Sequence, residues 1–184
     1  MTDGPMFRSV HSALAFAFSH QGLNGKATIL GRLSSKELPG EGRGLSGLDG
    51  AAMAGMIQRH VFDDLGELQR SVVIAKFSQP SACPTCGNTH DTSQRIEAIE
   101  KLAHHTLAEM DRERPSLALR RALVRRYFGE RIHMQDLAKR TGVHQNTATN
   151  QARKVHKILQ KLEREAMHML DESLCDIVGE TENA

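Results

Sequence analysis

Aromatic residues are scarce in this chain of 184 residues, which has no tryptophan, one tyrosine and six phenylalanines. Because sheet-rich cores draw on aromatic and β-branched side chains, this composition disfavours an all-β fold. The chain also lacks any apolar run near the ~20 residues of a membrane-spanning helix. Its first residues do not form the charged start, apolar middle and small-residue cleavage site of a secretory signal. We therefore expect a soluble, cytoplasmic protein without a membrane partner.

Cysteine is also scarce, with three residues in the chain. An odd number of cysteines without a secretory signal argues against a disulfide framework. Cys83 and Cys86 stand in Cys-Pro-Thr-Cys-Gly, which is half of a tetrahedral zinc site. No second pair follows at zinc-ribbon spacing, so zinc binding and a free, reduced pair stay equal alternatives, and zinc is the one candidate cofactor. Further ligands would have to fold close from elsewhere in the chain: His90, His104, His105 or Cys175.

Motifs of enzyme active sites are missing as well. The chain has no Gly-x-Ser-x-Gly elbow, no phosphate-binding Gly-Lys-Ser/Thr loop and no His-Glu-x-x-His pair. His104 and His105 occupy consecutive positions, so at most one of them can face a given site on a helix. No βαβ pattern surrounds the two cysteines, which disfavours a thioredoxin-like redox role. We expect a protein that is not an enzyme.

The net charge of +2 conceals a strong asymmetry along the chain. Residues 112–168 contain 14 Lys/Arg against 5 Asp/Glu, a balance of +9, and the rest contains 10 against 17, a balance of −7. A basic block in an otherwise acidic protein indicates a polyanionic partner for that block. A solvated helical face is the alternative that charge alone leaves open.

Apolar residues at steps of three and four predict helices in the first two thirds of the chain. Ser9 is a candidate N-cap for the first helix, and Ser46 with Asp49 resembles a capping box that opens the second. The predicted helices lie within residues 1–20, from 46 to about 61, over 67–77 and over 92–114. The second has an apolar stripe at Met53, Met56, Ile57 and Val61, and the fourth at Ile96, Ile99, Ala103, Leu107 and Met110.

The last third of the chain predicts three helices in succession. Pro115-Ser116 suits the start of the first, and Gly129 ends it. A short helix over 134–138 precedes a tight turn at Thr141-Gly142-Val143, where glycine can take the left-handed conformation that closes a helix. A long helix then runs from about His144 into the Asp171 region.

This long helix carries a heptad-like apolar seam. The seam could mediate self-association or pack within the chain, and its alanine-rich start suits close intramolecular packing better. Its members are Ala148, Ala152, Val155, Leu159, Leu162, Ala166 and Met169.

The stretch from Asp136 to Arg153 has the spacing of a helix-turn-helix. Ala138 is small where two helices would cross, and Gly142 lies four residues later, where the backbone must turn. Short polar and amide side chains follow on the second helix, where Asn and Gln can pair with adenine and Arg can reach guanine or phosphate. These candidate base-reading residues are His144, Gln145, Asn146, Thr149, Asn150 and Arg153.

Cations around the same stretch are natural contacts for DNA phosphates. An αα-corner that binds no DNA has similar spacing, but the basic surroundings favour a partner of double-stranded DNA. The candidate phosphate-binding residues are Arg121, Arg125, Lys139, Arg140, Lys154 and Lys157.

The stretch Leu119-Arg-Arg-Ala-Leu-Val-Arg-Arg-Tyr-Phe-Gly-Glu130, followed by Asp136–Val143 and a basic helix, resembles region 4 of bacterial sigma factors. That region reads the promoter −35 element and contacts the RNA polymerase flap. Together with Phe7–Phe18, the Gly-rich loop and the cysteine-containing interruption, the chain is similar to the Q antitermination proteins of phages and prophages. On this resemblance, the residues at the positions where region 4 touches bases are Gln145, Asn146, Thr149 and Asn150.

The resemblance implies a function without covalent chemistry. A Q-type protein binds DNA beside a phage-type late promoter and loads onto paused RNA polymerase that holds its sigma factor. It then narrows the exit channel so that the nascent RNA cannot form terminator hairpins. Some Q proteins carry cysteines in a comparable interruption, and this likeness favours zinc binding at Cys83 and Cys86. A complete sigma factor is disfavoured, because the first half of this chain is acidic and poor in aromatic residues.

The expected fold is therefore all-α, with a sigma-region-4-like helix-turn-helix. The expected division is a helical body over 1–111 with a Gly-rich loop (22–50) and a cysteine-containing loop (78–91), the helix-turn-helix with its long helix over 112–178, and a tail over 179–184. The alternative function is a conventional helix-turn-helix activator or repressor that acts at initiation. An interaction module that uses the long seam ranks below both.

Overall fold

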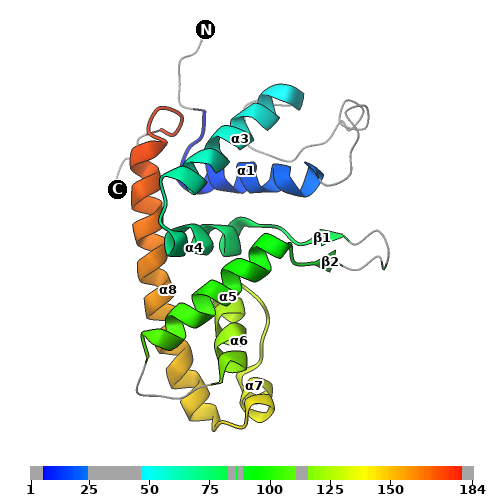
Figure 1. The fold of residues 1–184 in the computed structure, drawn as a ribbon, viewed down its shortest axis with the longest axis vertical. Helices are drawn as coiled ribbons and strands as arrows, with labels where there is room; N and C mark the ends of the chain where they lie inside the picture. Colours follow the sequence, from blue (N-terminus) through cyan, green and yellow to red (C-terminus); the bar gives the residue numbers. More distant parts are fainter. Residues whose placement is uncertain (1–5, 25–46, 83–85, 87–88, 111–115, 180–184) are drawn as a thin grey trace. The chain divides into compact units, whose positions relative to one another are not determined.

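The computed structural model describes residues 6–24, 47–82, 86, 89–110 and 116–179. Apart from two short strands, the regular structure of these residues is helical, which confirms the expected all-α fold (Figure 1). The helices are α1 (Val10–Asn24), α3 (Gly47–Asp63), α4 (Glu67–Phe77), α5 (Ser93–Ala108), α6 (Leu117–Tyr127), α7 (Met134–Thr141) and α8 (Gln145–Ser173). No helix among the described residues has both the length and the apolarity to cross a membrane.

The chain divides into two compact units, each made of separated segments. The terminal unit comprises residues 1–66, 77–92 and 166–184, and the central unit comprises 67–76 and 93–165. This division differs from the expected boundary between residues 111 and 112. The reason is that α8 contributes to both units, and that α5 packs against α6 across the expected boundary.

In the terminal unit, α1 packs against α3. Ser9 caps α1 as expected, since its Oγ accepts the backbone N–H of Ser12 at 3.2 Å. Ile57 and Val61 of α3 are fully buried, but Met56, expected on the same stripe, is 38% exposed. Ser46 of the expected capping box lies outside the described residues.

The two ends of the chain meet in the terminal unit through main-chain hydrogen bonds. The N–H of Phe7 donates to the carbonyl of Ile177 at 3.0 Å, and the N–H of Gly179 donates to the carbonyl of Phe7 at 2.9 Å. Phe7 also pairs with Val178 in an isolated parallel bridge, and both side chains are buried. Residues before α1 and after α8 thus belong to one core.

A short hairpin replaces the expected loop around the two cysteines. Strands β1 (Ser81–Ala82) and β2 (Thr89–His90) pair antiparallel, with Ser81 opposite His90 and Ala82 opposite Thr89. Strands of two residues are too short to produce a recognisable alternation of apolar and polar residues. These two strands were therefore not predictable from the spacing of residues.

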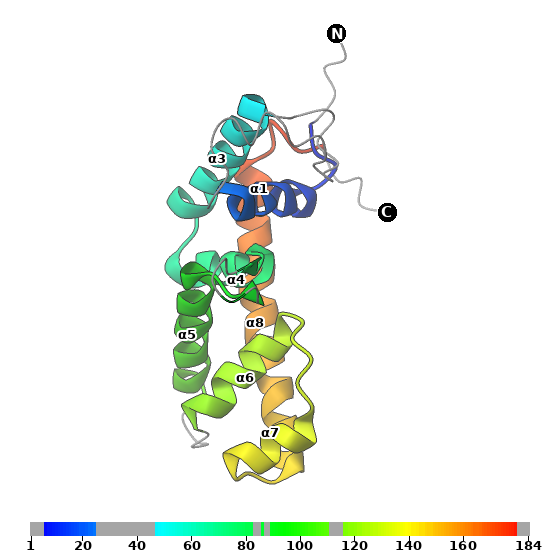
Figure 2. The ribbon, with the colours of Figure 1, turned by 90° about the vertical axis from the view of Figure 1, so that its right-hand side faces the viewer.

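In the central unit, α5 packs against α6 through an apolar face that contains Ile99, Leu102 and Leu119. Ile96 is 44% exposed, although its spacing placed it on the stripe of α5. Helix α5 ends at Ala108, earlier than the expected end near residue 114. In both views, α7 lies beside the first turns of α8 (Figure 1 and Figure 2).

Most of the predicted seam of α8 is buried within the chain itself, although Ala152 is half-buried. Ala148, Val155 and Leu159 have at most 1% of their surface exposed. At the far end, Met169 is 37% exposed and Leu170 is fully buried instead. A straight α-helix drifts by about 20° per heptad against a strict seven-residue repeat, so after three heptads the inward position has moved from residue 169 to 170.

Candidate nucleic-acid interface

The candidate interface is built on the turn between α7 and α8. Gly142 ends α7 in the left-handed conformation, with φ of 69°, and its N–H donates to the carbonyl of Ala138. The N–H of Val143 donates to the same carbonyl at 3.1 Å. A side chain at position 142 would be strained at this φ. The expected turn and its glycine are confirmed.

His144 directly precedes α8 and caps it with its ring. The Nδ1 atom of His144 accepts the backbone N–H of Asn146 at 3.2 Å, and its carbonyl accepts the N–H of Ala148 at 3.0 Å. The ring thus satisfies one of the free N–H groups at the helix start. Because Nδ1 is the acceptor, the neutral ring carries its proton on Nε2. His144 has this structural task in addition to the base contact expected of it.

The other candidate base-reading residues lie on an exposed face of α8. Gln145, Asn146, Asn150 and Arg153 are exposed, whereas Ala148 on the opposite side is buried. Thr149 is half-buried, and its hydroxyl donates to the carbonyl of Gln145 at 2.9 Å. The structure therefore brings these side chains together at the start of one helix.

The six candidate phosphate-binding residues fall into two groups. Four of them are exposed around the turn and on α8: Lys139, Arg140, Lys154 and Lys157. The other two lie on α6 in ion pairs, with 2.6 Å from Arg121 Nε to Glu100 and 2.8 Å from Arg125 Nη1 to Glu130. An arginine that already holds a carboxylate offers less charge to a phosphate.

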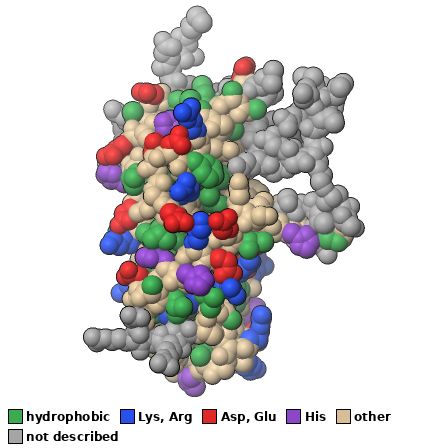
Figure 3. Space-filling model, viewed as in Figure 1, with side chains coloured by type: hydrophobic (Ala, Val, Ile, Leu, Met, Phe, Trp, Pro, Cys, Tyr) green, Lys and Arg blue, Asp and Glu red, His purple; other side chains and the backbone are tan. Residues whose placement is uncertain are grey.

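Opposite charges alternate elsewhere on the molecule, as the face in Figure 3 shows. In the central unit, the ammonium of Lys101 donates to carboxylates of Glu67 at 2.8 Å and Glu97 at 2.9 Å. The hydrogen bond to Lys101 lowers the pKa of Glu67, and the same bond raises the pKa of Lys101. Such mixed surfaces have little attraction for a polyanion.

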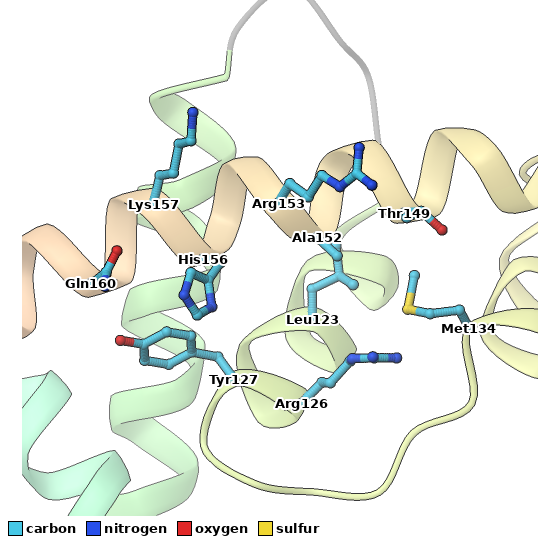
Figure 4. A pocket seen from close by; sticks show the side chains of 10 residues that line it. All are labelled: Leu123, Arg126, Tyr127, Met134, Thr149, Ala152, Arg153, His156, Lys157 and Gln160. Atoms are coloured by element: carbon cyan, nitrogen blue, oxygen red, sulfur yellow. The ribbon is translucent and has the colours of Figure 1, made fainter.

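An open groove of about 730 Å³ lies between α6, the start of α7 and α8 (Figure 4). Leu123 lies at its floor between α6 and α8, and Arg126, Arg153 and Lys157 bring positive charge to it. None of its lining residues is acidic. The lining residues are Leu123, Arg126, Tyr127, Met134, Thr149, Ala152, Arg153, His156, Lys157 and Gln160.

Tyr127 fixes one wall of this groove. Its hydroxyl donates to Glu163 at 2.6 Å, and its ring meets the His156 ring edge-on with centroids 5.0 Å apart. Burial and the hydrogen bond to Glu163 raise the pKa of Tyr127, so the phenol stays protonated. Glu163 also accepts from Lys76 at 2.5 Å. These bonds tie α6, α8 and α4 together beside the groove.

The groove is the part of the site that sequence reasoning missed. Arg126 was not among the candidate residues, because nothing in its spacing shows that the end of α6 faces α8. Arg126 does lie within Leu119–Glu130, the stretch that resembles sigma region 4. That position in the sequence does not show which way its side chain points.

The cysteine motif is brought partly together on the hairpin. Cys86 Sγ lies 3.1 Å from His90 Nε2, and both residues are exposed. A thiol and an imidazole are ligands that zinc prefers. Cys83 lies outside the described residues, and within the described ranges no group of three or more candidate ligands occurs. Of the other candidate ligands, His104 and His105 lie on α5 and Cys175 follows α8.

Comparisons of the chain with protein-family models, curated proteins and solved structures found no match. The functional inference therefore depends on the chemistry and arrangement of the residues described above.

Proposed function

We propose that this protein is a DNA-binding transcription factor that reads duplex DNA with the first turns of α8. The observation that carries the proposal is the exposed row of amide and guanidinium side chains at a helix start that follows a tight glycine turn. Asn146 and Asn150 offer paired donors and acceptors for adenine, and Arg153 offers donors for guanine or for a phosphate. In this proposal α7, the turn and α8 act as a helix-turn-helix.

Cations beside the row supply the affinity that does not depend on sequence. Lys139 and Arg140 at the end of α7, and Lys154 and Lys157 on α8, are exposed near the candidate reading residues. Neutralised phosphates release counterions, so the proposed complex weakens steeply with salt.

Within this class, we propose a Q-type antitermination factor. The support is the resemblance of Leu119–Glu130 and Asp136–Val143 to sigma region 4. The partners that this resemblance implies are RNA polymerase with its sigma factor and the nascent RNA in the exit channel. A travelling factor needs a surface that stays bound after the DNA contacts break, and the acidic terminal unit is the candidate for it.

The DNA-binding proposal is tested by selection of duplexes from a randomised pool, followed by binding measurements from 50 to 200 mM salt. We expect an enriched sequence and a steep negative dependence of affinity on salt. The matched control exchanges Asn146 and Asn150 for alanine, which keeps the charge and removes the amides. If the wild-type protein enriches no sequence and binds no duplex, the proposed function is wrong.

The antitermination proposal needs a separate assay, because a conventional regulator at initiation binds DNA in the same way. A template with the selected site beside a promoter and a terminator well downstream distinguishes the two. A Q-type factor increases the fraction of transcripts that pass the terminator. A conventional activator or repressor changes only the number of transcripts that start.

A further inference from the structure

The face of α8 that carries the candidate reading residues continues into the groove. At 3.6 residues per turn, Gln145, Thr149, Arg153, His156 and Gln160 project within about 80° of one another. The first three belong to the row of reading residues, and the last four line the groove. The row and the groove are thus two stretches of one helix face.

The length of this face exceeds the width of a DNA major groove. From Gln145 to Gln160 the helix axis rises by about 22 Å at 1.5 Å per residue, whereas the major groove is about 12 Å wide. If α8 enters the major groove with its first turns foremost, as recognition helices contact bases with their N-terminal residues, the turns near His156 lie beyond the edge of the groove. The DNA there is a phosphodiester strand.

The charge of the groove suits that strand. Arg126, Arg153 and Lys157 are exposed and surround an apolar floor of Leu123, Met134 and Ala152, without an acidic residue in the lining. Arg126 donates from Nη1 to the carbonyl of Ile132 at 2.9 Å, which uses one of the five N–H donors of its guanidinium. The remaining donors can bind phosphate oxygens.

We propose that this groove holds the phosphodiester strand that borders the reading site, with Arg126 of α6 opposing Arg153 and Lys157 of α8. The inference rests on the proposed DNA binding and deepens it, because it assigns a second contact from a helix outside the α7–turn–α8 segment. The apolar floor faces the deoxyribose carbons between phosphates. Tyr127 is a positioning residue, since its bond to Glu163 holds α6 at the required place beside α8.

The test compares Arg126→Gln and Lys157→Gln with Lys101→Gln. All three changes remove one positive charge from the central unit, but Lys101 lies on α5 in ion pairs with Glu67 and Glu97, away from the groove lining. The probe is the duplex selected with the wild-type full-length protein. Thermal melts first establish that each variant is folded like the wild type.

We expect Arg126→Gln and Lys157→Gln each to weaken binding by roughly fivefold for matched and scrambled duplexes alike, and to reduce the salt slope by about one. Lys101→Gln leaves both quantities unchanged. In ethylation-interference experiments, ethylation of one or two phosphates on a single flank of the site should weaken binding of the wild type but no longer weaken binding of Arg126→Gln.

Three outcomes overturn the inference and are distinguishable. If the wild-type protein binds no duplex, the proposed function fails and the groove assignment falls with it. If Arg126→Gln and Lys101→Gln bind DNA alike and both still capture purified RNA polymerase, DNA binding stands and the groove holds neither a DNA strand nor a polymerase segment. If Arg126→Gln keeps its DNA affinity but loses capture of purified RNA polymerase, the groove binds an acidic protein segment instead of DNA.

Discussion

The two units of this protein differ in charge far more than the chain as a whole suggests. The central unit contains 18 Lys/Arg and 10 Asp/Glu, a balance of +8, whereas the terminal unit contains 6 and 12, a balance of −6. The buried cores differ as well, since the buried phenylalanines Phe7, Phe16, Phe18 and Phe77 all belong to the terminal unit, whereas the buried apolar side chains of the central unit include no aromatic residue. Under the proposed function, this opposite charge assigns the polyanionic partner to the central unit.

The largest expected effect concerns the boundary between the units. A fragment of residues 112–184 corresponds to the domain expected from the sequence, but it lacks α5, which packs against α6, and the segments that form the terminal unit. Its buried seam would be exposed to water. We therefore expect the fragment to show no cooperative thermal melt by circular dichroism and no specific DNA binding. A cooperative melt of the fragment would contradict this prediction and would support the domain boundary at residue 112 that the sequence predicts.

The second prediction sharpens what belongs to the terminal unit alone. We propose that Cys83, Cys86 and His90 bind zinc, because Sγ of Cys86 and Nε2 of His90 already lie 3.1 Å apart. Elemental analysis of the full-length protein should find about one zinc per chain in the wild type and almost none in Cys86→Ser. The matched control is Cys175→Ser at an exposed cysteine outside the hairpin, which should keep its zinc. Less than a tenth of an equivalent in the wild type would favour the free, reduced pair.

The third prediction separates two tasks within the central unit. Asn146→Ala should weaken binding of the selected duplex by about 1–3 kcal/mol and leave scrambled duplexes nearly unaffected, because an amide that reads a base is lost. Arg140→Ala should weaken both kinds of duplex alike and reduce the salt slope, because a phosphate contact is lost. Anisotropy titrations at several salt concentrations measure both quantities. Identical behaviour of the two variants would contradict the division between reading and clamping residues.

The smallest expected effects compare one glycine from each unit. Gly142→Ala in the central unit forces a side chain into a conformation with φ of 69° and should lower the free energy of unfolding by about 1–2 kcal/mol. Gly55→Ala lies within α3 of the terminal unit, where an added Cβ meets no atom within 4 Å. It should raise the free energy of unfolding by about 0.5–1 kcal/mol. Urea denaturation measures both, and equal signs would show that the turn does not require glycine.

Local features of this protein were predictable from the sequence because their causes are local. The helix over Glu67–Phe77 has the expected bounds, and Ser9 and Gly142 have the expected conformations. The predicted seam departs from the structure at Met169, where the drift between 3.5 and 3.6 residues per turn had accumulated, and at Ala152, which is half-buried and lines the groove. The exposure of Gln145, Asn146, Asn150 and Arg153 on one helix followed equally from their spacing.

Features that depend on tertiary packing were not predictable. The position of Arg126 in the groove depends on the angle at which α6 meets α8. The spacing of residues along one helix does not determine that angle. Ile96 has the spacing of a core residue but is exposed, because the face that α5 buries is set by α6 and not by α5 alone. The division into units escaped prediction because each unit combines segments far apart in the chain.

The main-chain bonds between Phe7 and residues 177–179 have a consequence for biosynthesis. A ribosome releases α1 early, but the partner of Phe7 is translated about 170 residues later. The segment around Phe7 must therefore wait, with its buried phenylalanines unprotected, until residues 177–179 have left the exit tunnel. The central unit has no such delay, because its last segment ends at residue 165. We therefore expect the central unit to fold before the terminal unit is complete, against the usual N-to-C order of nascent chains.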